Sequence, residues 1–524
     1  MNRLGLALLL LLSVSGAAAI LYAVPHATGG TWDSVVYIGV ARNLANGTGF
    51  YLAHSLPLRP STHWAPLYPL ILATPAYFGI DPVKSAKWID AVVFSLSIFI
   101  TGIIAWRFCG RSWLYGILAA LFLLFSPDLI EILSQSLSEG PFIVLVLTAL
   151  LLILLDKESE SWKSMTGSAI ALSAAVLTRY AGTFFAVAGF LIRFSWRELA
   201  QKWRLALGFV LVVTLPLAIW VVHNVHAGGE AVGDRRLLYH PISKHMLREF
   251  VLTVSLWFGP AQVRMAVRVV VLSGLMAMIL SGVVWAFRSL QGKPDSHLHS
   301  ILSFAVSCIV VDAIYVVFIF VNFAFLDASS HPNGRLLCPI YPITALLLVS
   351  GLALWQRRYG PESSRGRLVF VLVLVLIGMN AARSWGTIRD IRTNGIGFQT
   401  QAWREDDIMR IVQNLPSDVT LYSDNPTLIY SYTRRASYFP PHRFDEGTNQ
   451  VNPNFEKDML SLEQLGSQKP IVLVSFEQWK NGALPTASEL IETSHFHTIY
   501  KSAKGTYVLC STACAVDTSN VVLK

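Results

Sequence analysis

Two acidic residues stand where a carboxylate could take part in catalysis. Asp33 lies in Thr31-Trp-Asp-Ser-Val-Val-Tyr37, soon after a first apolar block, and Glu139 lies in Ser138-Glu-Gly-Pro141, directly before another. A helix would place Asp33 and Tyr37 on one face, because they are four residues apart. A carboxylate in such a place can accept a proton from a substrate hydroxyl. Glu139 could equally be a helix-capping residue ahead of the proline.

Three arginines are candidates for binding a phosphate. Arg59 lies in the stretch after Asp33, Arg179 stands between two apolar segments, and Arg335 follows Pro332-Asn-Gly. A charge between apolar segments is costly and usually functional. The planar guanidinium suits phosphate, and arginines near a membrane surface are what a lipid-phosphate site needs. Arg179 could instead form an ion pair with an acid such as Glu139.

Aromatic and histidine residues accompany these charges. His63, Trp64 and Tyr68 follow Arg59 closely. Their rings could stack on a sugar or form the aromatic belt at the membrane–water boundary, and neither reading is favoured. The candidate metal ligands are His223, His226 and His331. The sequence assigns no complete ligand set, although zinc usually needs three protein ligands, so no cofactor is certain and a divalent metal is left open.

The composition indicates a protein that spans a membrane many times. The chain of 524 residues is 53% hydrophobic and 14% charged, whereas soluble domains are about 25% charged. Its apolar residues form blocks that approach or exceed the roughly 20 residues needed to cross a bilayer. This pattern argues against a soluble enzyme and against a disordered chain. Eleven spans are expected, at 4–23, 90–108, 113–126, 141–155, 165–178, 181–194, 205–223, 265–287, 300–326, 336–355 and 368–385.

The positions of Lys and Arg predict the orientation of these spans. They concentrate in alternate loops, which is typical of the cytoplasmic side. The net charge of +9 is therefore explained without a nucleic-acid partner. The opposite side receives the long first loop 24–88, which contains Asp33, the loop before Glu139, the turn at Arg179, and 327–335. The basic loop 224–264 is an exception to the pattern. The candidate residues are thus expected on the extracytoplasmic face of the inner (plasma) membrane.

The last part of the chain, residues 386–524, differs in kind. It shows a helix-like stretch at 406–414 and strand patterns at 419–423, 471–476 and 506–510, which together predict a small α/β domain. With eleven spans in residues 1–385, this domain lies outside the cytoplasm. The five cysteines are too few for a disulfide scaffold. Cys510 and Cys514 could form one disulfide or be two separate thiols.

The order of the motifs resembles the GT-C superfamily of integral-membrane glycosyltransferases, and most of all the branch of the protein O-mannosyltransferases and the lipid A aminoarabinose transferases. The resemblance runs from about residue 20 to 226, and a weaker similarity continues through residues 335–342. One helix is followed by a long outer loop with an early Asp. The motifs that carry the resemblance are Asp33, Pro66-Leu-Tyr-Pro69, Ser126-Pro127, Ser138-Glu139, Leu177-Thr-Arg-Tyr180 and Arg335-Leu-Leu-Cys-Pro-Ile-Tyr-Pro342.

This resemblance implies transfer of a sugar from a polyprenyl-phosphate donor, with inversion, on the outer face. It places the catalytic acid at Asp33, the second acid at Glu139, and contacts to the phosphate at Arg59 and His63. Two features depart from the family. Relatives often have two adjacent acids where this chain has Asp33-Ser34, and many have Lys or His nearer the prolines.

The expected partners are a polyprenyl-phosphate-linked sugar, membrane lipid, and a glycan, lipid or protein acceptor. The sequence leaves two other functions to consider. A transporter or flippase of a lipid-linked or polar substrate would carry internal repeats and ionisable groups within its spans, whereas this chain shows no repeat and its polar groups gather at one face. A non-catalytic envelope assembly protein would leave the first loop and the arginines unexplained. The sequence does not identify the sugar or the acceptor.

Overall fold

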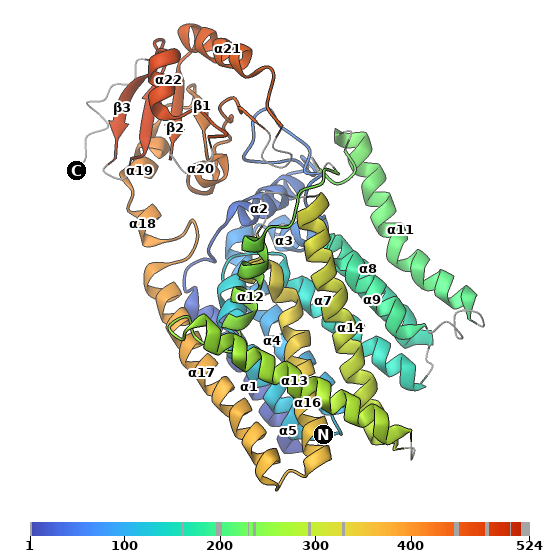
Figure 1. Cartoon of the computed structure of the whole chain (residues 1–524). Coiled ribbons are helices and arrows are strands. Elements are labelled where there is room, and N and C mark those ends of the chain that lie inside the picture. Colours follow the sequence, from blue (N-terminus) through green and yellow to red (C-terminus); the bar gives the residue numbers. More distant parts are fainter. Residues whose placement is uncertain are drawn as a thin grey trace.

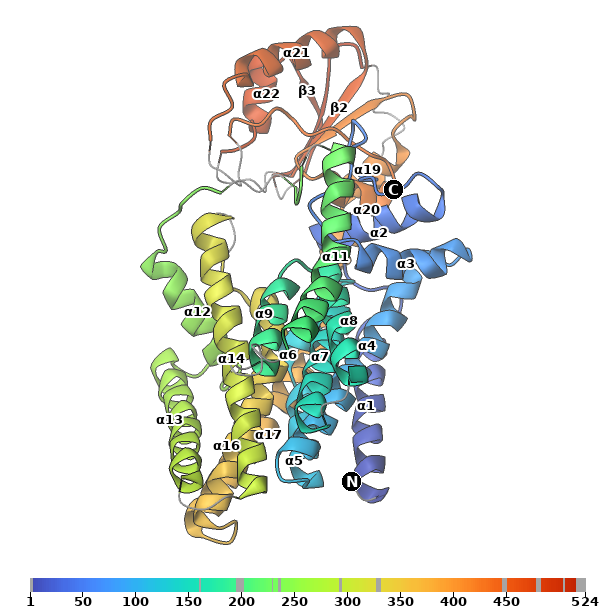
Figure 2. The ribbon, with the colours of Figure 1, turned by 90° about the vertical axis from the view of Figure 1, so that its right-hand side faces the viewer.

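The computed structural model describes residues 3–159, 162–194, 202–228, 230–233, 237–291, 295–326, 331–444, 450–476, 482–502 and 505–514. A bundle of helices carries a part built around a β-sheet at one end, and the N-terminus lies at the opposite end (Figures 1 and 2). The helices up to the sheet are α1 (Arg3–Ala23), α2 (Trp32–Ala45), α3 (Leu67–Tyr77), α4 (Pro82–Phe108), α5 (Trp113–Leu124), α6 (Pro127–Ile132), α7 (Glu139–Ser159), α8 (Trp162–Thr178), α9 (Gly182–Arg193), α11 (Trp203–Gly228), α12 (Lys244–Leu256), α13 (Met265–Leu290), α14 (Ser296–Phe325), α15 (Gly334–Leu337), the 3-10 helix η1 (Cys338–Ile340), α16 (Tyr341–Tyr359) and α17 (Ser364–Asn394).

Eight helices of the described residues are long and apolar enough to cross a membrane: α1, α4, α7, α11, α13, α14, the continuous stretch α15–α16, and α17. The chain is therefore a multi-pass membrane protein. This number is three fewer than the eleven spans expected. The segments expected at 113–126, 165–178 and 181–194 are helical, but α5, α8 and α9 have only 12, 17 and 12 residues. A helix of 12 residues covers about 18 Å, which is less than the roughly 30 Å of a hydrocarbon core.

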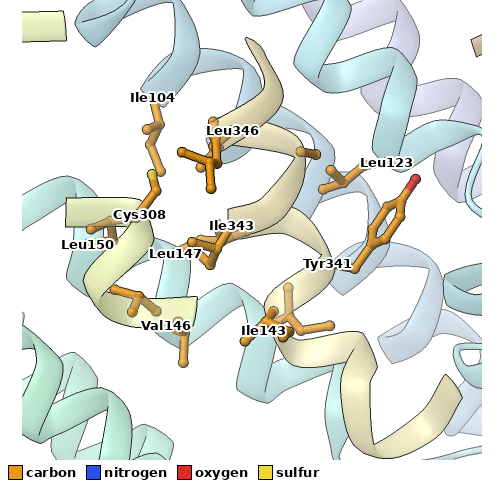
Figure 3. Close-up of a cluster of buried hydrophobic side chains, with 14 of the residues drawn as sticks. Ile104, Leu123, Ile143, Val146, Leu147, Leu150, Cys308, Tyr341, Ile343 and Leu346 are labelled. Atoms are coloured by element: carbon orange, nitrogen blue, oxygen red, sulfur yellow. The ribbon is translucent and has the colours of Figure 1, made fainter. Parts of the chain in front are cut away.

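The bundle is built around α16. Of the most apolar part of the α15–α16 stretch, 89% is buried, against 28% for α1 at the edge. Figure 3 shows side chains from several helices meeting beside α16, among them Leu123 of α5, Ile143 of α7, Cys308 of α14 and Ile343 of α16. Close packing of this kind holds helices together where lipid tails are as apolar as the side chains. Large apolar side chains are exposed on peripheral helices, for example Leu11 of α1 and Leu215 of α11, as expected for helices that face lipid.

The first long loop places α2 and α3 at the sheet end of the bundle (Figure 2). A capping box starts α2: Thr31 Oγ1 accepts a hydrogen bond from the backbone NH of Ser34, and Ser34 Oγ accepts one from the NH of Thr31. The helix ends at Ala45, with Asn46 as its C-cap, and Gly47 follows with φ of +78°, a conformation that favours glycine. Asp33 thus stands in the first turn of a helix, as the sequence predicts.

The chain after α17 forms a four-stranded sheet. Its strands are β1 (Thr420–Ser423), β2 (Ile471–Ser475), β3 (His497–Lys501) and β4 (Tyr507–Cys510), in the order β1-β2-β4-β3. β1 and β2 are parallel, and β4 is antiparallel to both β2 and β3. The accompanying helices are α18 (Gln401–Arg404), α19 (Asp407–Asn414), α20 (Pro426–Thr433), α21 (Phe455–Gln468) and α22 (Ala487–Thr493). A disulfide joins Cys510 and Cys514. The strand β3 has no counterpart in the prediction.

The sheet part is joined to the first loop by backbone pairing. Gly30 and Gly397 form an isolated parallel bridge, and Phe398 NH donates to Gly30 O at 2.7 Å. Ser437 NH donates to His54 O at 3.1 Å. α17 reaches Asn394, so the boundary expected between residues 385 and 386 falls inside this helix.

Candidate active site

Four charged side chains from four distant segments meet beside α2. Asp33 comes from α2, Glu139 begins α7, Arg179 lies between α8 and α9, and Arg335 belongs to α15. We call them the four-charge cluster. Its acids and arginines alternate: Arg335 contacts both Asp33 and Glu139, and Arg179 contacts Glu139. The sequence named all four residues as site candidates, and the structure brings them together.

Glu139 is the centre of the cluster. Its Oε1 accepts from Arg179 Nη1 at 2.6 Å and from Arg335 Nε at 2.6 Å. Its side chain is 0% exposed. The carboxylate also stands in the first turn of α7, where the helix dipole favours negative charge. Of the two alternatives for Arg179, an ion pair with Glu139 is therefore the one seen in this structure.

Asp33 lies at the more open side of the cluster. Its Oδ1 accepts from Trp64 Nε1 at 2.9 Å, and its Oδ2 accepts from Arg335 Nη2. Burial alone would raise the pKa of Asp33, but the charge and hydrogen bond of Arg335, helped by Trp64 and Arg179, outweigh it and hold the pKa below its ordinary value. Asp33 is thus ionised at neutral pH and able to accept a proton.

Ser138 is a hydroxyl that the sequence analysis did not select for the site. Its Oγ accepts from Arg179 Nη1 at 3.0 Å and lies 3.1 Å from the hydroxyl of Tyr37. Burial, followed by the charge of Asp33, raises the pKa of Tyr37, so its hydroxyl keeps its proton. The buried ring of Tyr68 packs edge-on against that of Tyr37, with 5.1 Å between centroids. The sequence feature that could have selected Ser138 is its position directly before Glu139, a candidate acid at a helix start.

Exposure changes across the cluster in a way that shows where a ligand could enter. The side chains of Glu139, Arg179, Asp33 and Arg335 are 0, 16, 23 and 31% exposed. Asp33 and Arg335 therefore form the accessible edge. In addition, Arg179 Nε is buried without a hydrogen-bond partner within the described residues. A guanidinium has five N–H donors. Arg179 and Arg335 use only some of theirs within the cluster, so each can still donate to an anion.

Two of the expected phosphate contacts are placed differently. Arg59 is exposed, and within the described chain its guanidinium takes no part in the four-charge cluster. His63 packs against Trp64, with 4.8 Å between ring centroids. Since Trp64 is the residue that donates a hydrogen bond to Asp33, His63 is one residue removed from that contact. Sequence order alone did not separate these two cases, since both residues lie in the same irregular segment.

The candidate metal ligands do not gather. His223 stacks on Trp220, with 5.1 Å between centroids, while His226 is exposed with Nδ1 2.7 Å from Val222 O. In the part of the chain that the structure describes, no group of three or more His, Cys, Asp or Glu residues could hold a metal ion.

An apolar cavity of about 550 Å³ lies between α3 and α4. Ile71, Ile80, Trp88 and Ile89 contribute to its lining, and Lys84 adds a single charge. None of its lining residues belongs to the four-charge cluster. Its first lining residue, Ile71, lies three residues after Tyr68 on α3, and Tyr68 packs against Tyr37 of the site.

Known structures share this architecture. No protein-family model matches the chain, and no curated protein matches it by sequence. ArnT from Cupriavidus metallidurans in the apo state has a TM-score of 0.58 and 14% identity, over 96% of this chain and 97% of that one. The oligosaccharyltransferase AglB from Archaeoglobus fulgidus, in complex with an inhibitory peptide and a dolichol-phosphate, has a TM-score of 0.55 and 11% identity, over 90% and 69%.

A third structure, the arabinofuranosyltransferase AftD from Mycobacteria, has a TM-score of 0.54 and 12% identity, over 99% of this chain and 40% of that one. The identities are low, so the likeness concerns the fold. All three are GT-C glycosyltransferases, and two of them match over most of both chains. The resemblance inferred from sequence is confirmed at this level: the chain has the fold of the GT-C membrane glycosyltransferases.

Proposed function

We propose that the protein is a membrane glycosyltransferase that moves a sugar from a polyprenyl-phosphate donor to an acceptor on the outer face of the membrane, with inversion. The observation that carries the proposal is the four-charge cluster, in which a partly exposed carboxylate lies beside two arginines. The neighbouring structures support it, because ArnT has also been solved bound to undecaprenyl phosphate, and AglB with a dolichol-phosphate.

In this proposal Asp33 is the general base. The acceptor oxygen attacks the anomeric carbon of the donor sugar, and its proton passes to a carboxylate oxygen of Asp33. At the same time the bond from the anomeric carbon to the phosphate oxygen breaks, and its electron pair stays on the phosphate. Trp64 and Arg335 each donate one hydrogen bond to Asp33. A carboxylate has about four lone-pair sites, so it keeps room for the proton.

The arginines stabilise the leaving phosphate. Negative charge develops on the phosphate oxygen as the bond breaks, and donors already fixed in place lower the energy of that state. Arg335 stands at the accessible edge beside Asp33, and Arg179 lies deeper behind Ser138. Glu139 holds both guanidinium groups through one oxygen, so we give it a positioning role. The half-buried Trp64 is proposed to line the sugar's binding place, and the buried rings of Tyr37 and Tyr68 would support it from behind, with His63 beside Trp64. Arg59 receives no role.

The proposal extends to the lipid chain and the topology. The cavity between α3 and α4 would receive the first part of the polyprenyl chain, since its walls are apolar. All eleven apolar helices would cross, with α5 continued by α6 and with α8 and α9 as a helical hairpin whose tip carries Arg179. Residues 386–524 would then form an extracytoplasmic α/β domain. The helix α17 would connect it to the transmembrane domain of residues 1–385.

The test is Asp33→Asn in the purified full chain in nanodiscs. Undecaprenyl-phosphate-linked sugars serve as donors, and release of undecaprenyl phosphate is measured. The amide keeps the shape but cannot accept the proton, so the rate should fall by roughly 10²–10⁴-fold, the usual contribution of a general base. Donor binding should change little, because the proton is transferred only in the transition state.

Glu131→Gln is the matched control, since Glu131 is an exposed acid of the short helix α6, eight residues before Glu139. It should keep wild-type turnover. A folded Asp33→Asn protein with near wild-type turnover would exclude Asp33 as the base, and Glu139 would become the leading candidate.

A further inference from the structure

A second group of polar side chains, which includes Arg268, lies between α13, α17 and the turn after α12. Arg268, in the first turn of α13, is 6% exposed. Its Nε and Nη1 atoms are buried and have no hydrogen-bond partner within the described residues. A buried guanidinium without an acceptor is costly, above all in a helix that crosses a membrane. Such an arginine points to a ligand that supplies the missing acceptors.

The turn from Leu256 to Gly259 fixes the position of Arg268. A Cβ at Gly259 would lie 2.9 Å from Arg268 Cγ, so the turn packs directly on the arginine's aliphatic stem. Trp257 holds the turn in place, because its Nε1 donates to Asp128 Oδ2 at 3.0 Å and its backbone carbonyl accepts from Asn380 Nδ2 at 3.1 Å. Arg268 is therefore held by its stem rather than by its charged end.

A second arginine lies beside the first. Arg383 of α17 donates from Nη1 to Leu256 O at 2.6 Å and to Asn380 Oδ1 at 2.9 Å. It lies within electrostatic range of Asp128 and of Arg268. This group thus contains two guanidinium charges and one carboxylate. The excess positive charge is what an anion site requires.

We propose that Arg268 and Arg383, with Trp257 and Asn380 around them, bind a phosphate group. This second anion site is separate from the four-charge cluster and does not depend on the proposed transferase function. A buried and a half-buried arginine, Arg268 and Arg383, match with their remaining N–H donors the several acceptor oxygens of a phosphate. Phosphate could reach the site as the headgroup of an anionic membrane lipid or as the free anion, and both share this chemistry.

The two sites adjoin through one contact. A Cβ at Gly334 would lie 3.6 Å from Asp128 Cγ, and Gly334 is the residue directly before Arg335 of the four-charge cluster. An anion bound between Arg268 and Arg383 would therefore sit behind the segment that carries Arg335. Its binding would neutralise the excess charge there and fix the Leu256–Gly259 turn.

The experiment measures binding to the purified full chain in a neutral detergent. The probes are dioctanoyl phosphatidate, the uncharged dioctanoylglycerol, and inorganic phosphate, with bound ligand counted by native mass spectrometry. Phosphatidate should bind and dioctanoylglycerol should not. In Arg268→Gln the affinity for phosphatidate should fall roughly 10–100-fold, the range expected for losing hydrogen bonds to a charged group. Arg335→Gln should leave this binding event intact, which separates it from the proposed donor site.

The matched control is Arg264→Gln, because Arg264 is exposed and lies one turn before Arg268. It removes the same charge and should keep wild-type affinity. If Arg268→Gln does not fold, Arg268→Lys and Arg383→Gln replace it and should weaken binding. Equal binding of phosphatidate and inorganic phosphate supports an anion site open to either source, and preference for phosphatidate supports a lipid headgroup. Unchanged affinity in folded Arg268 and Arg383 variants, or an equal loss in Arg264→Gln, would overturn the proposal.

Discussion

Replacing Glu139 by Gln should destabilise the protein far more than replacing Asp33 by Asn. The Glu139 side chain is 0% exposed, and its Oε1 takes a hydrogen bond of 2.6 Å from each of two arginines. Gln keeps the size but not the charge, so two guanidinium groups face a neutral amide. Removing one partner of a buried ion pair costs about 3–5 kcal/mol. The free energy of unfolding of Glu139→Gln should fall by that amount, followed in detergent by thermal or denaturant unfolding.

The double variant Glu139→Gln/Arg179→Gln isolates the reason for this loss. It removes one charge of each sign, so it should recover part of the stability lost in Glu139→Gln. Asp33→Asn is the comparison, because that side chain is 23% exposed and its loss should cost little stability. If Glu139→Gln unfolds at the wild-type midpoint, or if the double variant is less stable than either single one, the buried ion pair does not carry the stability assigned to it.

Three further predictions follow from other groups. Arg335→Gln should raise the pKa of Asp33 and move the acid limb of the kcat/KM profile to higher pH, because burial then goes unopposed by its main counter-charge; an unmoved limb would separate Asp33 from that titration. Burial lowers the pKa of His54 to about 4. Stability should therefore be full above the ordinary pKa of about 6.5 and fall by about 3 kcal/mol as pH drops from there through 4, and His54→Gln should unfold with a flatter pH dependence. A C-terminal alkaline phosphatase fusion should be active and a cytoplasmic fluorescent reporter dark; the reverse would refute the orientation.

The charged residues of the candidate site could be selected from the sequence because their positions are unusual. Arg179 between two apolar segments and Glu139 at the head of one stand out, since such charges are costly. The orientation rule then put both on the same face as Asp33. What the sequence did not contain is the pairing itself. That Arg335 bridges Asp33 and Glu139 depends on how four segments approach, and spacing along the chain does not report this.

Other features lay beyond the sequence for identifiable reasons. Arg59 and His63 share one irregular segment, in which no periodicity indicates which side chain turns inward. The helices α5 and α9 have only 12 residues each. Apolar residues continue past the end of α5, but the helix stops there because Phe125 and Ser126 lead into the separate helix α6. The strand β3 has mostly exposed and half-buried residues, so it lacks the apolar run that identified β2. In each case tertiary packing decides what local composition leaves open.

The bridge between Gly30 and Gly397 gives the part of the chain after α17 a mechanical role. Gly397 has φ of +58°, and a Cβ on it would overlap the carbonyl of Gly30, so these two backbones meet without room for a side chain. Gly30 lies three residues before Asp33, so residues 396–398 support the start of α2. The sheet part is consequently not a removable appendage. A chain cut at residue 385 would lose the support of that helix start, and any force on the sheet part would reach Asp33 through the backbone.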